Sequence, residues 1–566
     1  MENRMHKFIV FSAVLIFSAI VANAQSGVEQ ARKYVESRDY SAAYAAIQPA
    51  VKSGLTGADA LILAGEIYLE FDKPDSAAVF LAKARDMNET QEITRIYAKA
   101  LSKSGKHGEA FEILRKLLKK DNKEALNHLA LAEAYLEADS LRQGELEIML
   151  ARDIDKNLAE VHYALGNLYF AQNIFELAKN SFEEALRINP SLVDARIKLA
   201  GSYLKLANAE MDEALSNELF SRSLKEWNAV AQQDPNNARA WYEQGKIFYM
   251  ASKWGESAKA FYKYVQLRPE NYMARWYLAQ ASFKIGQYDS AAVQLPIVAE
   301  HIDSVRGKAV IMLAQAKFES RKFSEATVAY KDAEKKTELD VNDYERFGTA
   351  AILSGDTSLA IKNFYAAIDG DSKKCGLMYR FAHLLRSRKQ YGEAISVFKR
   401  RIESCNDSNS TESRLYIGIS YYSDAKYDSA MLATREYIAM QPDNLYGRII
   451  LANCFNALKQ VDSAKATLIN IIESGRTNAS ARKNDMENAF ATLCGLYLDT
   501  KDFGAVLKYG KQWLEYNPES VTANIYTAVG YQGNGDKDNA CKYYRETLKR
   551  DPNNKTAKDN LKKLGC

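Results

Sequence analysis

The amino-acid sequence repeats itself with a period close to 34 residues, and this period limits the folds open to the chain. The unit is clearest in the segment AEVHYALGNLYFAQNIFELAKNSFEEALRINP, which begins at Ala159. With Ala159 as position 1, related units start near residues 24, 58, 91, 125, 159, 193, 238, 272, 307, 341, 375, 411, 445, 487 and 521. Such self-similarity is typical of an array in which each unit buries its apolar face only against its neighbours.

Two positions of the unit test this frame. Position 8 should be small, because two helices of a unit would cross there. Its occupants are Ala31, Gly65, Ala98, Ala132, Gly166, Ala200, Gly245, Ala279, Ala314, Gly348, Ala382, Gly418, Ala452, Cys494 and Ala528. Position 32 holds six of the nine prolines, which end a helix. Both positions therefore indicate that each unit is a pair of helices.

The clearest unit resembles the tetratricopeptide repeat, with His162 where that family usually has tryptophan. The residues that carry the resemblance are Leu165, Gly166, Tyr169, Ala178, Phe182, Ala185 and Pro190. The resemblance implies an all-α, right-handed superhelical solenoid of antiparallel helix pairs, with about fifteen repeats and a continuous concave groove. Most of the 34 tyrosines and 22 phenylalanines are then expected to pack between helices.

Departures from the frame predict where the array is interrupted. Extra residues around 206–217 are compatible with a longer helical hairpin, whereas the polar segment 476–485 is typical of a hinge or linker. A weaker interruption falls at 404–410. We therefore expect subdomains at 25–235, 236–410, 411–486 and 487–566. The last residues, NKTAKDNLKKLGC, predict a short amphipathic helix that caps the array.

The first 24 residues have the pattern of a cleaved export signal. Arg4 and Lys7 precede an apolar stretch over 8–21, and Ala22-Asn23-Ala24 forms a small-x-small cleavage site before Gln25. An uncleaved anchor is the alternative, although the apolar stretch is shorter than the roughly 20 residues that span a bilayer. We expect an exported protein of the periplasm or cell envelope of a Gram-negative bacterium, not membrane-spanning after cleavage.

The six cysteines all lie in the C-terminal part of the chain. In the repeat frame, Cys375 opens the first helix of its unit and Cys405 follows the second, so an antiparallel hairpin brings them to the same end. The capping helix should likewise return Cys566 towards Cys541. Two disulfides are therefore candidates in an oxidising compartment, against free buried thiols as the alternative.

The sequence contains no constellation that indicates catalysis. Motifs for zinc binding, phosphate binding and nucleophilic catalysis are all missing, and the histidines after residue 24 fall singly in different units. The net charge of 76 − 72 = +4 gives no electrostatic sign of nucleic-acid binding. We predict a protein that is not an enzyme, with no metal, no cofactor and no nucleic-acid partner.

The predicted binding surface follows from the family resemblance, in which positions 2, 5, 9, 12 and 13 of each first helix line the groove. The candidate residues are Tyr163, Asn167, Phe170, Tyr242, Lys246, Tyr249, Trp276, Gln280, Phe283, Tyr379, His383 and Arg386. Aromatic rings interleaved with polar groups suit an extended peptide. A glycan is the alternative ligand, and packing between units is the alternative role. The family's clamp for a C-terminal carboxylate has Lys where this chain has Tyr163, so that specificity is not carried over.

A short motif, Asp-Ser followed by a small or aliphatic residue, occurs six times, for example at Asp75-Ser76-Ala77 and Asp428-Ser429-Ala430. It resembles an O-glycosylation acceptor of some Gram-negative bacteria, but most copies fall where a residue that caps the second helix is expected. The leading hypothesis is a non-catalytic exported scaffold that binds protein or peptide partners in envelope assembly or secretion. A glycan-binding or glycan-processing accessory protein is the alternative. The oligomeric state is left open.

Overall fold

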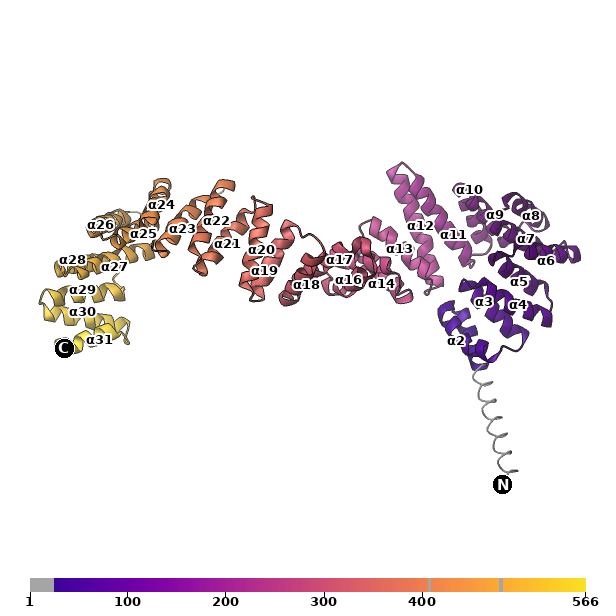
Figure 1. The fold of residues 1–566 in the computed structure, drawn as a ribbon, viewed down its shortest axis with the longest axis horizontal. Coiled ribbons are helices and arrows are strands. Elements are labelled where there is room, and N and C mark those ends of the chain that lie inside the picture. Colours follow the sequence, from indigo (N-terminus) through magenta and orange to yellow (C-terminus); the bar gives the residue numbers. More distant parts are fainter. Residues whose placement is uncertain (1–24, 406–408, 478–481) are drawn as a thin grey trace, which may run out of the picture. The chain divides into compact units, whose positions relative to one another are not determined.

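The computed structural model describes residues 25–405, 409–477 and 482–566, and all regular elements in these ranges are helices (Figure 1). The export-signal pattern at 1–24 and parts of both polar interruptions, 406–408 and 478–481, lie outside the described residues. The chain divides into two compact units, of which unit 1 ends at Ser320 and unit 2 begins at Arg321. The subdomain boundaries near 236, 410 and 486 stay predictions.

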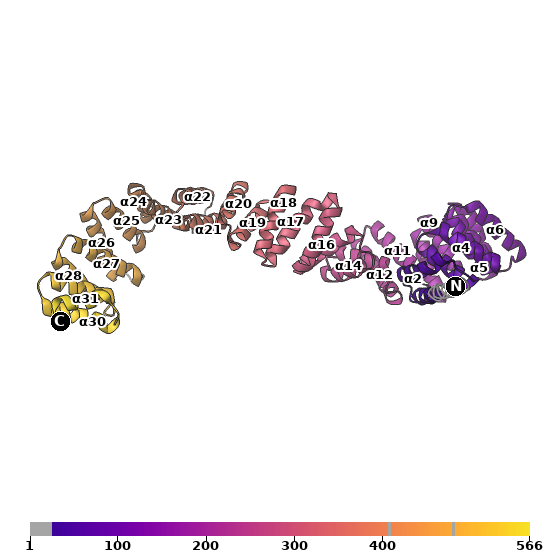
Figure 2. The same cartoon turned by 60° about the horizontal axis from the view of Figure 1, so that its bottom comes forward.

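In unit 1, a first helix and a second helix alternate along the chain, and consecutive helices lie side by side (Figure 1 and Figure 2). The first helices are 25–36, α3 (Ala58–Glu70), α5 (Gln91–Lys103), α7 (Ala125–Glu137), α9 (Ala159–Ala171), α11 (Val193–Ala209), α13 (Ala238–Met250), α15 (Tyr272–Lys284) and α17 (Arg306–Glu319). The second helices are α2 (Tyr40–Ser53), α4 (Pro74–Met87), α6 (His107–Lys120), α8 (Leu141–Ile154), α10 (Phe175–Ile188), α12 (Glu213–Gln233), α14 (Trp254–Leu267) and α16 (Tyr288–His301), and a short 3₁₀ turn, η1 (Asp303–Val305), precedes α17.

Unit 2 has the same alternation. Its first helices are α19 (Val341–Leu353), α21 (Cys375–Ser387), α23 (Asn409–Ser423), α25 (Leu445–Ala457), α27 (Lys483–Asp499) and α29 (Val521–Gly533). Its second helices are α18 (Phe323–Lys336), α20 (Thr357–Gly370), α22 (Tyr391–Ser404), α24 (Tyr427–Met440), α26 (Val461–Thr477), α28 (Phe503–Tyr516) and α30 (Lys537–Arg550). The predicted capping helix is α31 (Lys555–Leu564), whose Ala557 is buried against the end of the array.

The small residue at position 8 is the contact point between the two helices of a repeat, as the repeat frame predicts. In α9, a Cβ added to Gly166 would lie 2.4 Å from the ring of Phe182, which stands at position 24 of the same repeat, in α10. Gly65 meets Leu81 and Gly348 meets Phe364 in the same way. A larger residue at position 8 would therefore push the second helix away. The fold class predicted from the repeat, a solenoid of about fifteen helix pairs, is confirmed.

The turn between the two helices of each repeat has a backbone conformation that the repeat frame did not predict. In fourteen of the fifteen repeats, position 15 has a left-handed φ, between +53° and +91°. Glycine occupies that position only in Gly105, Gly286, Gly355 and Gly535, and the others are residues such as Asp72 and Lys389. A left-handed residue ends the first helix and turns the chain back to begin the second. The exception is the repeat that begins at 193, where an insertion replaces the short turn.

The Asp-Ser motifs make no capping hydrogen bond at the second helices α4, α8, α16 and α24, which corrects that expectation, although Ser140 does occupy the N-cap position of α8. Helix α4 begins at Pro74 with Lys73 as its N-cap residue, and no side chain makes the capping hydrogen bond. Asp75 lies inside the first turn, as Asp289 does in α16 and Asp428 does in α24. There a carboxylate interacts favourably with the positive end of the helix dipole, which accounts for the acidic residue of the motif.

The structure contains the two disulfides that the repeat frame brings within reach. Cys375 and Cys405 are joined with their Cα atoms 5.9 Å apart, and Cys541 and Cys566 with their Cα atoms 6.2 Å apart. The first closes the end of the α21–α22 hairpin, and the second attaches the chain end after α31 to α30. Cys454 and Cys494 are buried free thiols, and burial raises the pKa of Cys454 to about 11 and that of Cys494 to about 12.

Candidate functional site

The twelve predicted groove residues come from α9, α13, α15 and α21, all first helices of their units. Eleven of them are half-buried, and Trp276 is buried. Nine lie in unit 1, and Tyr379, His383 and Arg386 lie in unit 2. They therefore form separate groups, each of which has its own surroundings.

A pocket of about 270 Å³ in unit 1 contains the first group. It is formed by α5, α7 and α9, the first helices of three consecutive repeats, and it includes Tyr163 and Asn167. Its other lining residues are Arg95, Ile96, Lys99, Ser102, Leu126, Leu129, Ala130, Glu133, Ala134, Leu136, Glu137, Glu160 and Ala164. Most of these stand at positions 2, 5, 6, 9, 12 and 13 of their units, so the pocket belongs to the groove face expected from the family resemblance.

The pocket combines an apolar lining with charged groups held in place. The ammonium of Lys99 lies 2.8 Å from the Glu133 carboxylate and so joins α5 to α7. The guanidinium of Arg95 donates a hydrogen bond to Asn127 Oδ1 at 2.9 Å. Ile96, Leu126 and Leu129 are apolar residues of the same lining. An extended chain with both apolar and polar side chains matches such a lining better than a purely apolar ligand does.

Burial and neighbouring charges set the electrostatics of this pocket. Burial alone would lower the pKa of the Lys99 ammonium, but the charge and hydrogen bond of Glu133 outweigh it and leave that pKa raised. Burial raises the pKa of the Tyr163 hydroxyl. A side-chain hydrogen bond with Asn167 opposes this increase, and the carboxylates of Asp194 and Glu133 add to it, so that the pKa stays raised. Tyr163 is therefore a neutral hydroxyl at ordinary pH.

Asn167 carries an unused hydrogen-bonding atom in the same pocket. Its Oδ1 atom is buried and has no hydrogen-bond partner among the residues that the structure describes. Buried polar side-chain atoms are normally paired, because leaving one unpaired costs roughly 1–3 kcal/mol. A ligand that donates a hydrogen bond to this atom, as a peptide N–H does, would remove that cost.

The second group, on α13 and α15, is occupied largely with packing. Tyr242 lies against Tyr264, with ring centroids 5.0 Å apart, and the Lys246 ammonium lies 5.5 Å from the centre of the Tyr242 ring. The Tyr249 hydroxyl donates to Gln280 Oε1 at 2.9 Å. Sugar binding by stacking needs an uncovered ring face. These rings already contact protein groups, so nothing in their arrangement favours a glycan.

Trp276 and Phe283 belong to the core of their repeat. The Trp276 side chain is 8% exposed and lies in a cluster with Leu295, Val298 and Ala309. Phe283 packs on the same cluster and meets the edge of Tyr288. For these two residues the packing role explains the aromatic side chain, and they offer little surface to a ligand.

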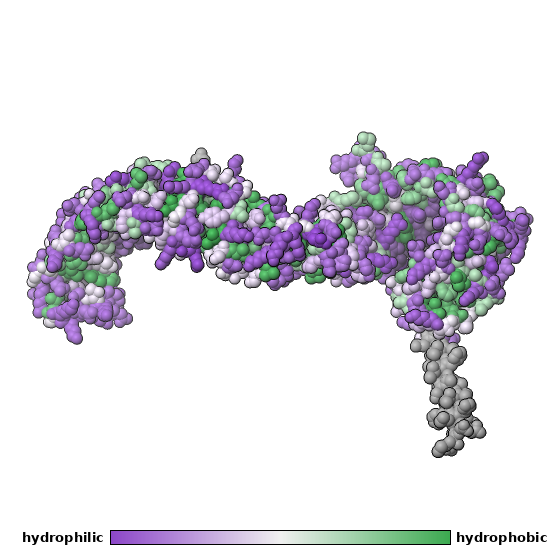
Figure 3. All heavy atoms as spheres, in the orientation of Figure 1, coloured by the Kyte–Doolittle hydropathy of each residue, from purple (hydrophilic) through white to green (hydrophobic). Residues whose placement is uncertain are grey.

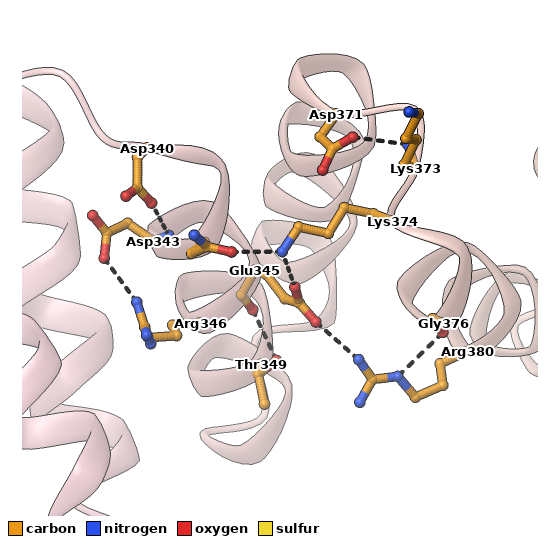
Figure 4. Close-up of polar contacts among 11 residues, drawn as sticks. Asp340, Asp343, Glu345, Arg346, Thr349, Asp371, Lys373, Lys374, Gly376 and Arg380 are labelled. Carbon is orange, nitrogen blue, oxygen red and sulfur yellow. Dashed lines mark hydrogen bonds and ion pairs between the residues drawn. The ribbon is translucent and has the colours of Figure 1, made fainter. Parts of the chain in front are cut away.

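The third group, in unit 2, is surrounded by polar contacts between successive repeats. Figure 4 shows Glu345 of α19 between two cations, Lys374 at 2.8 Å, which is the N-cap residue of α21, and Arg380 of α21 at 2.9 Å. Farther along, the Tyr379 hydroxyl donates to the Glu412 carboxylate at 2.8 Å, which joins α21 to α23. These contacts hold the repeats in register.

His383 lies inside this polar network. Burial, with the Arg386 charge adding to it, lowers the pKa of the His383 imidazole, so the ring is neutral at pH 7. Its ring lies 4.6 Å from Tyr379 and 4.3 Å from Tyr416, centre to centre. The guanidinium of Arg386 donates to His383 Nδ1 at 3.3 Å, which assigns the ring hydrogen to Nε2.

Sequence reasoning did not identify most of the pocket in unit 1. The missed residues include Arg95, Lys99, Leu129 and Glu133, which occupy positions 5 and 9 in the two repeats before α9. Tyr163 and Asn167 stand at the same two positions of their own repeat and were predicted as groove residues. The repeat frame therefore contained the signal, but positions 5 and 9 of these two repeats hold charged or aliphatic residues in place of aromatic rings.

Comparison with known proteins agrees with this architecture. Sequence profiles described as tetratricopeptide repeat match residues 159–192, residues 28–92 and 208–272, and residues 523–554. The chain is a tetratricopeptide repeat protein. Repeats of this class serve as scaffolds for protein–protein interaction and present an extended concave binding surface. None of the described helices is both long and apolar enough to cross a membrane.

Among curated relatives of this tetratricopeptide repeat protein, the TPR repeat-containing protein YpiA of Bacillus subtilis is 23% identical over 251 residues, which is 40% of this chain and 59% of the relative. The uncharacterized protein ycf37 of Pyropia yezoensis is 29% identical over 122 residues, 21% of this chain and 68% of the relative. The peroxisomal targeting signal receptor of Kluyveromyces lactis is 23% identical over 191 residues, 32% of this chain and 33% of the receptor. The matches thus span from 33% to 68% of the length of these relatives.

Solved structures show similar repeats at low identity. The structure of Naa15/Naa10 bound to HypK-THB has a chain that matches with a TM-score of 0.33 and 11% identity, covering 90% of this chain and 96% of that one. YrrB, described as a TPR protein with an unusual peptide-binding site, matches with a TM-score of 0.25 and 20% identity, covering 34% of this chain and 95% of YrrB.

Proposed function

We propose that this protein is a non-catalytic scaffold that binds an extended segment of a partner protein in the groove of unit 1. The observation that carries the proposal is the pocket between α5, α7 and α9, where three repeats contribute to one surface. Its apolar lining suits side chains of the segment. The buried Oδ1 atom of Asn167 is placed to accept a backbone N–H of the segment.

Filling the pocket tests this proposal without removing any core side chain. Ala130 lines the pocket and is half-buried, so Ala130→Arg would place a long side chain in the space a ligand needs. Ala45→Arg, at an exposed position of α2, is the matched control. Partners crosslinked in the native host should be lost at least tenfold from A130R and retained by A45R. Equal recovery from the two variants would contradict binding in the pocket.

We further propose that the scaffold is exported and serves in envelope assembly or secretion. Two observations support export: the signal pattern at 1–24, and two disulfides, which persist in oxidising compartments and are rare in the cytosol. Mass spectrometry of the natively produced protein should find an N-terminus at Gln25, two intact disulfides and two free thiols. An uncleaved chain with six free thiols would reject export.

A further inference from the structure

The hairpin of α11 and α12 departs from every other repeat in unit 1 and forms a surface outside the groove. Helix α11 has 17 residues and α12 has 21, whereas α9 has 13 and α10 has 14. The pair is therefore longer than its neighbours, and Figure 1 shows α12 reaching beyond them. The inserted sequence that was expected to lengthen the hairpin does so.

The tip of this hairpin is an ordered turn. Glu210 Oε1 accepts hydrogen bonds from the backbone N–H of Met211 at 2.9 Å and of Asp212 at 3.0 Å. Asp212 then caps α12 by accepting from the N–H of Leu215 at 2.8 Å. Ser216 ties the start of α12 to α11 through the Ala207 carbonyl at 2.8 Å. The tip can therefore present its side chains in a fixed arrangement.

Apolar side chains on this hairpin are exposed and stand beside a groove. Met211 is 98% exposed at the tip, and Leu215 is 44% exposed one turn into α12. A groove of about 290 Å³ lies between the start of α10 and the hairpin. Its lining combines apolar and charged residues: Leu206, Ala209, Leu215, Leu219, Glu176, Lys179, Glu210, Glu218 and Arg222. Figure 3 shows hydrophobic and hydrophilic atoms side by side at the projecting end of the hairpin.

The acidic charge of the tip indicates a partner that carries basic residues. Residues 206–217, LANAEMDEALSN, contain three acidic residues and no basic one. The two cations on the groove are already paired, Lys179 with Glu176 and Arg222 with Glu218. By contrast, the carboxylates of Glu210, Asp212 and Glu213 make no ion pair with any residue in the described part of the chain.

We propose that the α11–α12 hairpin is a second docking site, which binds a basic amphipathic helix of a partner protein. Leucine-like side chains of that helix lie in the groove and cover Met211 and Leu215, and its Lys or Arg residues pair with the carboxylates of the tip, which have no cationic partner among the described residues. A second copy of this chain fits less well, because it would bring two acidic tips together. The site is separate from the groove between α5 and α9 and does not depend on it.

A labelled synthetic helix tests the site on the full chain. The probe is a capped 14-residue helical peptide of leucine and lysine with a fluorophore and a benzophenone, and its control replaces each lysine with glutamate. Fluorescence anisotropy should show binding of the lysine probe only, weakening as salt is raised. Irradiation should crosslink the probe to residues of α10, α11 or α12.

Two variants decide the outcome. Met211→Ser with Leu215→Ser should weaken binding of the lysine probe at least tenfold. Met87→Ser, which removes a methionine 61% exposed and flanked by Asp86 and Glu89, is the matched control and should leave it unchanged. Equal affinity in the double variant overturns the proposal, as does a dimer in sedimentation that Met211→Ser dissociates. A130R should bind the probe normally, so failure here is distinct from failure of the groove.

Discussion

Unit 1 and unit 2 use the same helical repeat but are held together by different means. All six cysteines belong to unit 2, and four of them form disulfides at the ends of helical hairpins. After residue 24, unit 1 has no cysteine, so packing, hydrogen bonds and ion pairs stabilise it without any disulfide. The pocket and the long hairpin both lie in unit 1. The candidate binding surfaces thus occur in the unit that has no covalent cross-link.

The largest expected effect comes from removing a core ring of unit 1. Phe182 is fully buried against Gly166, and a Phe→Ala substitution in a protein core lowers the free energy of unfolding by about 3–5 kcal/mol. Phe182→Ala should therefore lower the urea midpoint of unit 1. Hydrogen exchange read by mass spectrometry should show lost protection in residues 25–320 only. Equal loss of protection in unit 2 would mean that the two units do not unfold separately.

Loss of a disulfide should have a comparable effect on the other unit. Cys375 and Cys405 are 30 residues apart, and closing a loop of that size is worth about 3–4 kcal/mol in the chain-entropy estimate. Replacing both by serine should destabilise unit 2 by that amount, and the same exchange measurement should find unit 1 unchanged.

Cys454→Ala provides the control for this pair, because it removes a cysteine without opening a loop. It should cost far less than the double serine variant. If the two variants lose the same stability, the cross-link itself contributes nothing, and the difference between the units would have to come from packing.

The sequence predicted features that depend on one repeat and missed those that depend on several. The small side chain of Gly166 and the reach of Cys375 to Cys405 follow from a single helix pair, and the structure contains both. In contrast, Tyr163 and Trp276 share position 5, yet the first lines a pocket and the second is buried. Trp276 is buried against Leu295 and Val298 of its own repeat and Ala309 of the next, and the residue type at position 5 does not by itself specify that packing.

A smaller effect is expected from adding one methyl group at position 8. A Cβ at residue 166 would lie 2.4 Å from the Phe182 ring, closer than real contacts allow, so Gly166→Ala should destabilise unit 1 by about 1–3 kcal/mol through overpacking. Gly245→Ala is the matched control, because its Cβ would lie 3.0 Å from Phe261. Its cost in the same denaturation experiment should be smaller. A larger loss of stability from Gly245→Ala than from Gly166→Ala would contradict the idea that the contact at position 8 sets the spacing of the two helices.

The smallest effects test whether the left-handed turn contributes equally in both units. Gly105 in unit 1 has φ +80°, and Ala425 occupies the same position of a repeat in unit 2 with φ +57°. Because a side chain disfavours this conformation, Gly105→Ala should cost unit 1 about 1 kcal/mol, and Ala425→Gly should stabilise unit 2 by about 0.5 kcal/mol. Thermal unfolding followed by hydrogen exchange would assign each shift to its unit. Shifts of the same sign would show that the turn conformation does not control stability, since the two substitutions change that one property in opposite directions.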